Sequence, residues 1–159
     1  MNIAQYQDPR VIQRIVNTAR TVAVVGLSSN PLRPSHFVGF YLLRHGYRVV
    51  PVNPREREVL GQRSVERLDQ IDGPVDVVDV FREPSVVPQL AEDAIAIGAK
   101  ALWLQFGVIS EVAAERAAAA GLDVVMDRCI KIEHARYVGR MHWLGFNTGV
   151  VSARRNVPR

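Results

Sequence analysis

A short loop rich in serine, asparagine and proline follows the first apolar run of the chain and leads into an amphipathic stretch. The apolar run 22–25 ends at Gly26, and a second apolar run, 47–52, ends at Asn53. This order predicts a strand, a loop, a helix and a parallel strand. Free backbone N–H groups of such a loop and the positive end of the following helix point to one spot, where a phosphate can bind.

The loop departs from the dinucleotide fingerprint. A G-x-G-x-x-G pattern needs a second glycine where this chain has Ser28. Proteins that bind NAD usually place an acidic residue at the end of the second strand, but here Asn53 and Pro54 are followed by Arg55. The arginine favours a ribose that carries a phosphate, as in NADP or in the 3′-phosphate of coenzyme A.

Short apolar runs alternate with helical patterns along the chain. We expect strands at 21–25, 47–52, 75–81, 100–104 and 122–126, with a turn at Leu60 and Gly61, a short helix at 64–68 and a helix at 127–138. Continuously apolar strands of this kind form a parallel sheet covered on both faces. The predicted fold is therefore an α/β, Rossmann-like open sheet of five parallel strands in the order 3-2-1-4-5, with helices on both faces.

Ligands of such sheets bind at the carboxyl ends of the strands, so the residues after each strand are the candidates. These residues offer cations, amide and hydroxyl donors and aromatic rings, and we find no catalytic dyad among them. The candidate ligand-binding residues are Gly26, Ser28, Ser29, Asn30, Pro31, Arg33, Ser35, Asn53, Arg55, Phe81, Arg82, Trp103, Gln105, Phe106 and Cys129.

Composition excludes several classes of protein. The chain has 159 residues, a formal net charge of +4 and a single cysteine, which fits a reducing cytoplasm without disulfides. No apolar run reaches the roughly 18 residues of a membrane span, and no basic stripe with interleaved aromatics indicates nucleic-acid binding. Four scattered histidines without a CxxC pair make a structural zinc site a poor explanation.

Five motifs in order resemble the small bacterial and archaeal CoA-binding proteins, which are relatives of the CoA-binding domain of succinyl-CoA synthetase alpha subunits. The motifs read VAVVGLSSNPLRPSHFV, GYRVVPVNP, VDVVDVFREP, GAKALWLQFGV and AGLDVVMDRCIKIEH. They cover roughly residues 8–138, so we expect a CoA-binding domain at 1–138. We expect a C-terminal extension at 139–159 that packs on the domain or on a partner through Trp143, Leu144 and Phe146.

The resemblance implies a place for each part of coenzyme A. Ser28, Ser29, Asn30 and Pro31 line the pyrophosphate loop, with Arg33 and Ser35 in support. Asn53 and Arg55 face the adenosine end, with Arg55 near the 3′-phosphate. Phe81 and Arg82 flank the adenine or the pantetheine arm, and Trp103, Gln105 and Phe106 border the pantetheine path. The phosphorylated histidine of the synthetase lies on a second domain, so synthetase activity is not implied.

Cys129 follows the fifth strand and lies beside Arg128 in the sequence. A buried free cysteine is often only a small apolar residue. A cation and a helix N-terminus would favour its thiolate instead. A further hypothesis therefore places Cys129 near the thiol of coenzyme A, where it forms a mixed disulfide.

The sequence leaves two main functions open, beside a third in which the protein is an interaction subunit that uses its basic tail. The leading one is a cytoplasmic, nucleotide-binding protein that binds coenzyme A or acyl-CoA without catalysis, as a carrier, sensor or regulatory module. The alternative is a small NADP-dependent oxidoreductase. The sequence counts against it, because the chain has no lysine four residues after a tyrosine, as a Tyr-x-x-x-Lys motif for hydride transfer requires. A homo-oligomer or an unknown protein partner is compatible with either.

Overall fold

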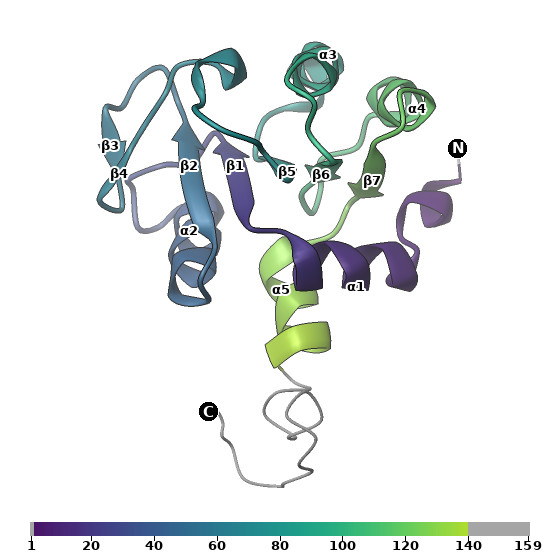
Figure 1. Ribbon diagram of the computed structural model, residues 1–159, viewed down its shortest axis with the longest axis horizontal. Coiled ribbons are helices and arrows are strands. Elements are labelled where there is room, and N and C mark those ends of the chain that lie inside the picture. The colour runs from purple at the N-terminus through teal and green to yellow at the C-terminus, as the bar shows by residue number, and fades with distance from the viewer. Residues whose placement is uncertain (1, 140–159) are drawn as a thin grey trace, which may run out of the picture.

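Five parallel strands form the centre of the computed structural model, which describes residues 2–139 (Figure 1). The strands of this sheet are β1 (Thr21–Val25), β2 (Arg48–Val52), β5 (Val77–Val80), β6 (Ala101–Leu104) and β7 (Asp123–Met126). The helices are α1 (Pro9–Thr18), α2 (Pro34–Arg44), α3 (Val87–Ala96), α4 (Glu111–Ala119) and α5 (Ile130–His134). Shorter turns of helix are η1 (Ile3–Tyr6), η2 (Leu68–Gln70), η3 (Pro84–Val86) and the π-type η4 (Ala135–Gly139). The predicted fold class is confirmed.

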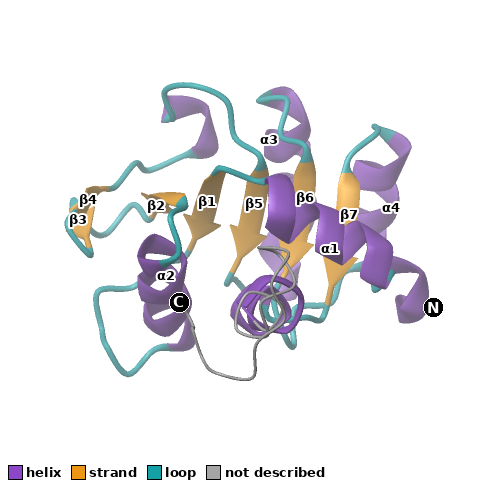
Figure 2. Cartoon of the chain, turned by 60° about the horizontal axis from the view of Figure 1, so that its bottom comes forward, coloured by secondary structure: helices purple, strands orange, loops and turns teal. Residues whose placement is uncertain are grey.

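Helices cover both faces of the sheet, as Figure 2 shows. Alternate residues of a strand point to opposite faces. On β1, Ala23 and Val25 pack in the apolar core beneath α3 and α4, whereas Val22 and Val24 pack in the core beneath α1, α2 and α5. Both faces of the central strands are therefore buried, which explains why these strands read as continuous apolar runs.

The order of the strands differs from the predicted order. It is β2-β1-β5-β6-β7, so the third predicted strand, β5, lies next to β1 and not outside β2. Pro51 explains the difference, because a proline that cannot donate a hydrogen bond belongs on an edge strand. The Pro51 carbonyl accepts the Val65 N–H on the side away from β1, so β1 loses no partner there. The strand order thus reverses between β1 and β5, where Gly26 and Phe81 follow the two strands.

The connection between β2 and β5 contains a small hairpin and no α-helix. Strands β3 (Glu58–Val59) and β4 (Gln62–Arg63) pair around the predicted turn at Leu60 and Gly61, both of which have positive φ. The predicted helix at 64–68 is wrong. Val65 instead pairs with Val52 along the outer edge of β2, where its backbone bonds protect that edge from further pairing.

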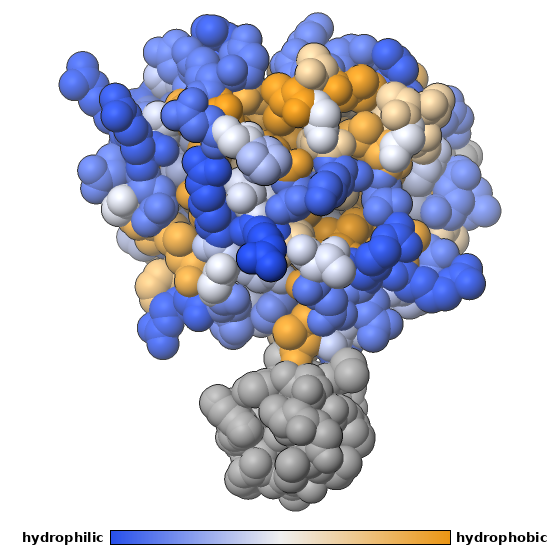
Figure 3. All heavy atoms as spheres, in the orientation of Figure 1, coloured by the Kyte–Doolittle hydropathy of each residue, from blue (hydrophilic) through white to orange (hydrophobic). Residues whose placement is uncertain are grey.

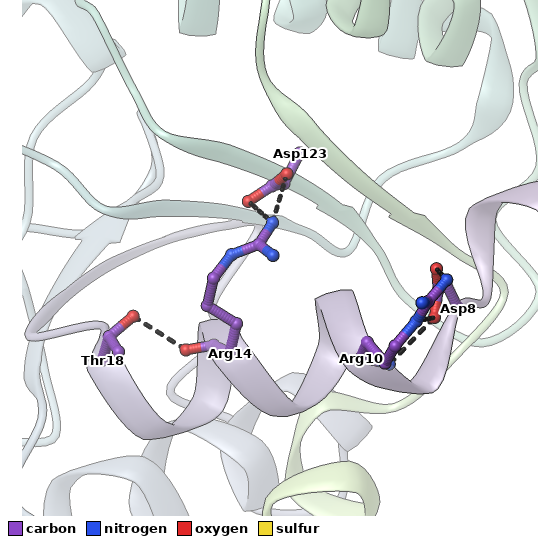
Figure 4. A network of polar contacts seen from close by, with 5 residues as sticks. All are labelled: Asp8, Arg10, Arg14, Thr18 and Asp123. Carbon is purple, nitrogen blue, oxygen red and sulfur yellow. Dashed lines mark hydrogen bonds and ion pairs between the residues drawn. The ribbon is translucent and has the colours of Figure 1, made fainter.

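Helix α1 begins at a capping residue and is linked to the far edge of the sheet. Asp8 is the N-cap and accepts the Arg10 N–H at 2.9 Å, while Pro9 takes the first helical position. Arg14 reaches across to β7 and donates to both carboxylate oxygens of Asp123 at 2.8 Å (Figure 4). An exposed pair of this kind contributes little energy, about 0.2–1 kcal/mol, so the position of α1 depends mainly on the buried side chains Ile12, Ile15 and Val16.

The face turned to the viewer in Figure 3 is largely hydrophilic, with apolar side chains gathered around α3 and α4. In the part of the chain that the structure describes, none of the helices combines the length and apolar character needed to cross a membrane. The expected extension, with Trp143, Leu144 and Phe146, lies outside the described residues, and its boundary at 138 stays a prediction.

Candidate functional site

A polar hollow of about 540 Å³ lies at the carboxyl ends of β1, β2 and β5. This is the point where the strand order reverses, the usual place for a ligand in an open α/β sheet. The residues that line the polar hollow are Gly26, Ser28, Arg33, Val52, Asn53, Pro54, Arg55, Glu56, Phe81, Arg82 and Glu83. Six of the predicted site residues besides Gly26 are among them: Ser28, Arg33, Asn53, Arg55, Phe81 and Arg82.

An apolar hollow of about 530 Å³ adjoins the polar one, and the two share Phe81 and Arg82. It lies between the start of α2, the end of β6 and the start of α5. Its lining residues are Pro34, Val38, Phe81, Arg82, Gln105, Phe106, Val108, Cys129 and Ile132. The predicted residues Gln105, Phe106 and Cys129 are thus brought together here. We call the two hollows together the groove.

Gly26 lets β1 end close to β5. Its φ is +87°, a conformation that other residues rarely adopt, and a Cβ atom there would lie 2.6 Å from the backbone oxygen of Phe81. Any side chain at Gly26 would therefore force β1 and β5 apart at the floor of the polar hollow.

Side chains of the loop hold the loop itself. The Ser35 hydroxyl accepts the Ser28 N–H at 3.0 Å, and the Ser28 hydroxyl accepts the Asn30 N–H at 3.0 Å. Ser35 is buried and is not the N-cap of α2, a position that Arg33 takes with Pro34 at the first helical position. Ser29, Asn30, Pro31 and Ser35 do not line either hollow. These four residues shape the loop whose other atoms line the groove.

Glu56 is not among the predicted site residues, yet it lines the polar hollow. Its carboxylate accepts the Ser29 N–H at 2.9 Å, and hydrogen bonding by Ser29 lowers the pKa of Glu56 below its ordinary value. The carboxylate of Glu56 therefore occupies a backbone N–H of the loop. Such an N–H is where a phosphate is expected to bind. An acidic residue that contacts a ribose is expected directly at the end of the second strand, at Asn53 to Arg55, and Glu56 lies one residue beyond.

Asn53 and Arg55 follow β2 into the polar hollow. The Asn53 amide donates to the Leu27 carbonyl at 3.0 Å, and its oxygen accepts the Arg55 N–H at 2.8 Å. Asn53 thus joins the ends of β1 and β2. A further hollow of about 430 Å³ shares Arg55 and Glu56 with the polar hollow and is also lined by Arg57 and Arg63 from the hairpin.

The arginines of the polar hollow differ in their ion pairing. Arg82 pairs with Glu83 at 2.6 Å. No carboxylate within residues 2–139 forms an ion pair with Arg33 or Arg55 in the structure. These two side chains can therefore meet the negative charge of a ligand without first breaking an ion pair.

Polar side chains around the apolar hollow form hydrogen bonds within the protein. The buried Gln105 accepts the Ile130 N–H at 3.1 Å through its side-chain oxygen, which fixes the start of α5. Trp103, another predicted site residue, is fully buried, and its indole N–H donates to the Arg128 carbonyl at 2.8 Å. Trp103 lines neither hollow and packs in the core below the groove.

Asp79 lies on β5 two residues before Phe81, between Val24 of β1 and Trp103 of β6. It is fully buried, and neither carboxylate oxygen has a hydrogen-bond partner within the described residues. Burial raises the pKa of Asp79 well above its ordinary value, so the group favours its neutral form. It lines neither hollow and has no place in the groove.

Known proteins are similar to this chain in sequence and in fold. The family profile described as "CoA binding domain" matches residues 20–135. The uncharacterized protein YneT of Bacillus subtilis (strain 168) is 41% identical over 124 residues, which are 78% of this chain and 92% of YneT. A solved structure of a hypothetical protein from Pyrococcus horikoshii OT3 is 38% identical with a TM-score of 0.81, and the match covers 83% of this chain and 93% of that one.

A larger enzyme contains the same fold. The dinucleotide forming acetyl-coenzyme A synthetase 1 of Ca. Korarchaeum cryptofilum matches with a TM-score of 0.63 at 22% identity. The match covers 73% of this chain but 28% of the synthetase. At this level of identity the likeness is one of fold, and it shows that the same arrangement of strands and helices occurs as one part of a longer chain.

Proposed function

The chain belongs to the CoA binding domain family, and from this membership we propose that it binds coenzyme A or an acyl-CoA in the groove. We further propose that it does so without catalysis, as a cytoplasmic carrier, sensor or regulatory module. The observation that carries the proposal is the pairing of a polar and an apolar hollow that share Phe81 and Arg82.

Coenzyme A has the same division along its length. One end is an adenosine with a 3′-phosphate and a pyrophosphate, and the other is a pantetheine arm that ends in a thiol. The arginines without ion pairs, Arg33 and Arg55, lie at the polar end of the groove. We place the pyrophosphate beside the loop and the start of α2, where backbone donors and the helix dipole favour an anion.

The adenosine end is assigned to the side of Asn53 and Arg55, with Arg55 near the 3′-phosphate. The further hollow beside Arg55 supports this assignment, because its three arginines, Arg55, Arg57 and Arg63, outnumber its two carboxylates, Glu56 and Glu66. The thiol end then lies toward Phe106 and Cys129. The C-terminal residues 139–159 are proposed to form an extension that packs on this domain or on a protein partner.

Thermal unfolding with a set of ligands tests the proposal. A ligand at about 100 times its Kd stabilises the native protein by about 2.7 kcal/mol, which gives an easily measured rise in Tm. We expect coenzyme A to raise the Tm, with a smaller effect of dephospho-CoA. NADP and NAD serve as the comparison, because Glu56 supplies a carboxylate that could meet a ribose. Stabilisation by NADP and not by coenzyme A would instead support an oxidoreductase.

A further inference from the structure

The apolar hollow offers few partners for a polar ligand. Its lining is mostly hydrocarbon and aromatic, from Val38, Val108 and Ile132 among others. Of its polar side chains, Gln105 uses its oxygen to accept the Ile130 N–H and keeps only its amide NH₂ for a ligand, and Arg82 already pairs with Glu83. The pantetheine arm contains two amides, and burying an amide without a hydrogen bond is costly. A hollow of this composition suits hydrocarbon better than it suits the arm.

Two large apolar side chains of the hollow are open to solvent. Phe106 is 76% exposed and Ile132 is 52% exposed. Exposed apolar groups that line a concave surface mark a place where a ligand can bury them. The hollow also continues directly from the polar one through Phe81 and Arg82, so one extended ligand can occupy both.

We propose that the apolar hollow binds the hydrocarbon chain of an acyl thioester of coenzyme A, so that the preferred ligand is an acyl-CoA rather than free coenzyme A. This inference rests on the proposed function. The pantetheine arm then passes along Phe81 and Arg82, where the two hollows meet, and the acyl chain lies against Phe106 and Ile132.

The dependence of affinity on chain length tests the inference. The full-length protein is titrated by calorimetry with free, acetyl-, butyryl-, hexanoyl- and octanoyl-coenzyme A. A buried methylene contributes about 0.8 kcal/mol. Because the hollow is open, we expect each added pair of methylenes to lower the Kd by about fivefold to fifteenfold. A Kd that stays constant along the series while free coenzyme A binds would overturn the inference and leave the proposed function intact.

Variants locate the effect. Ile132→Asn and Phe106→Ser are expected to remove most of the gain with chain length, and in Ile132→Asn the Kd of free coenzyme A changes by less than about twofold. Both side chains are exposed, so the fold does not depend on them. Val112→Ser is the matched control, because Val112 is 67% exposed on α4 and lines neither hollow. Equal gains in all four proteins would contradict the assignment to this hollow.

A variant that ends at Gly139 separates the acyl chain from another occupant, the C-terminal segment of the chain itself. That segment contains Trp143, Leu144 and Phe146. Gains with chain length in both the full-length and the shortened protein support an acyl site. Gains that occur only in the shortened protein would assign the hollow to residues 140–159 and overturn the inference. If no member of the series binds to either protein, the proposed function itself fails.

Discussion

The bond from the Ser29 N–H to the carboxylate of Glu56 lies where, in the proposed site, a phosphate of the ligand competes with a residue of the protein. The lowered pKa of Glu56 shows that the loop stabilises negative charge there. A phosphate that takes the Ser29 donor must displace the carboxylate or lie beside it. Glu56 therefore opposes the ligand that the rest of the polar hollow attracts.

Glu56→Gln is accordingly expected to bind coenzyme A more tightly. The amide oxygen can still accept the Ser29 N–H, but the negative charge is gone. Two unit charges about 4 Å apart in water repel by about 1 kcal/mol, so we expect the Kd to fall by about fivefold in a titration at low salt. Glu58→Gln is the control, since Glu58 is exposed on the hairpin and lines neither hollow. Weaker binding by Glu56→Gln than by Glu58→Gln would refute the competition.

Arg55 carries the recognition of the 3′-phosphate in the proposed site. Arg55→Gln removes a charge-assisted hydrogen bond, which is worth about 1.5–3 kcal/mol. Coenzyme A should then bind about tenfold to a hundredfold more weakly, whereas dephospho-CoA should be little affected. Arg20→Gln serves as the control, because Arg20 is exposed and precedes β1 at the opposite end of the sheet. An equal loss for both ligands would show that Arg55 does not contact that phosphate.

At the scale of elements, the strand order shows what the sequence could and could not predict. Alternating apolar runs predicted five parallel strands covered by helices, because burial on both faces leaves a clear signal. Pro51 indicates that β2 is an edge strand, which leaves the position next to β1 for β5. The pairing of Val65 with the edge of β2 left no local pattern, because two backbone bonds at one bridge do not change the apolar periodicity.

The site was predictable to a similar degree. Residues directly after strands were found because the fold class assigns them to one edge of the sheet. The apolar hollow was only partly found, since Val38 and Ile132 lie on helices whose orientation follows from packing. Trp103 at the end of a buried strand resembled a ligand-contacting residue in sequence, but its indole N–H is taken by the Arg128 carbonyl.

Aromatic residues and histidines join α2, β2 and α5 behind the groove. The Tyr41 hydroxyl and Nδ1 of the buried His134 share a hydrogen bond of 2.8 Å, and the His134 ring meets those of His45 and Tyr47 edge-on. Burial, followed by the charge of His45, lowers the pKa of His134 from 6.5 to about 4. The folded protein therefore holds His134 neutral through the mildly acidic range.

The His134 pKa predicts a loss of stability in acid. Between pH 6.5 and about 4 the unfolded chain binds a proton that the folded chain does not, so the free energy of unfolding falls as the pH falls. The expected loss from this residue is about 2–3 kcal/mol. Urea unfolding from pH 7.5 to 4 should show a shallower loss for His134→Gln than for His45→Gln. Parallel curves for the two variants would rule out His134 as the cause.

Asp79 predicts a pH dependence of the opposite sign. Its folded pKa lies well above the ordinary 3.8, so above that pH the unfolded chain releases a proton that the folded chain keeps. The free energy of unfolding of the natural protein, relative to Asp79→Asn, should therefore fall as the pH rises from about 4. The slope is at most about 1.4 kcal/mol per pH unit. A constant difference between the two proteins across this range would mean that Asp79 is ionised in the folded state.

At the scale of the whole molecule, the groove crosses the carboxyl edge of the sheet from the hairpin side to α5. Segments far apart in the sequence form it. They are the loop after β1, the residues after β2 and β5, the residues after β6 from Gln105 to Val108, and the start of α5 with Cys129 and Ile132. The net charge of +4 favours an anionic ligand such as coenzyme A. The central claim is that one ligand occupies both hollows at once.

Mapping of backbone amide chemical shifts during a titration with hexanoyl-coenzyme A tests this claim most directly. The account predicts that two groups of amides shift together and with a single Kd. One group is at Ser29, Arg55 and Glu56, and the other is at Phe106, Cys129 and Ile132. Shifts confined to the first group would mean that the acyl chain leaves the apolar hollow free, and shifts at neither group would contradict the groove as the binding site.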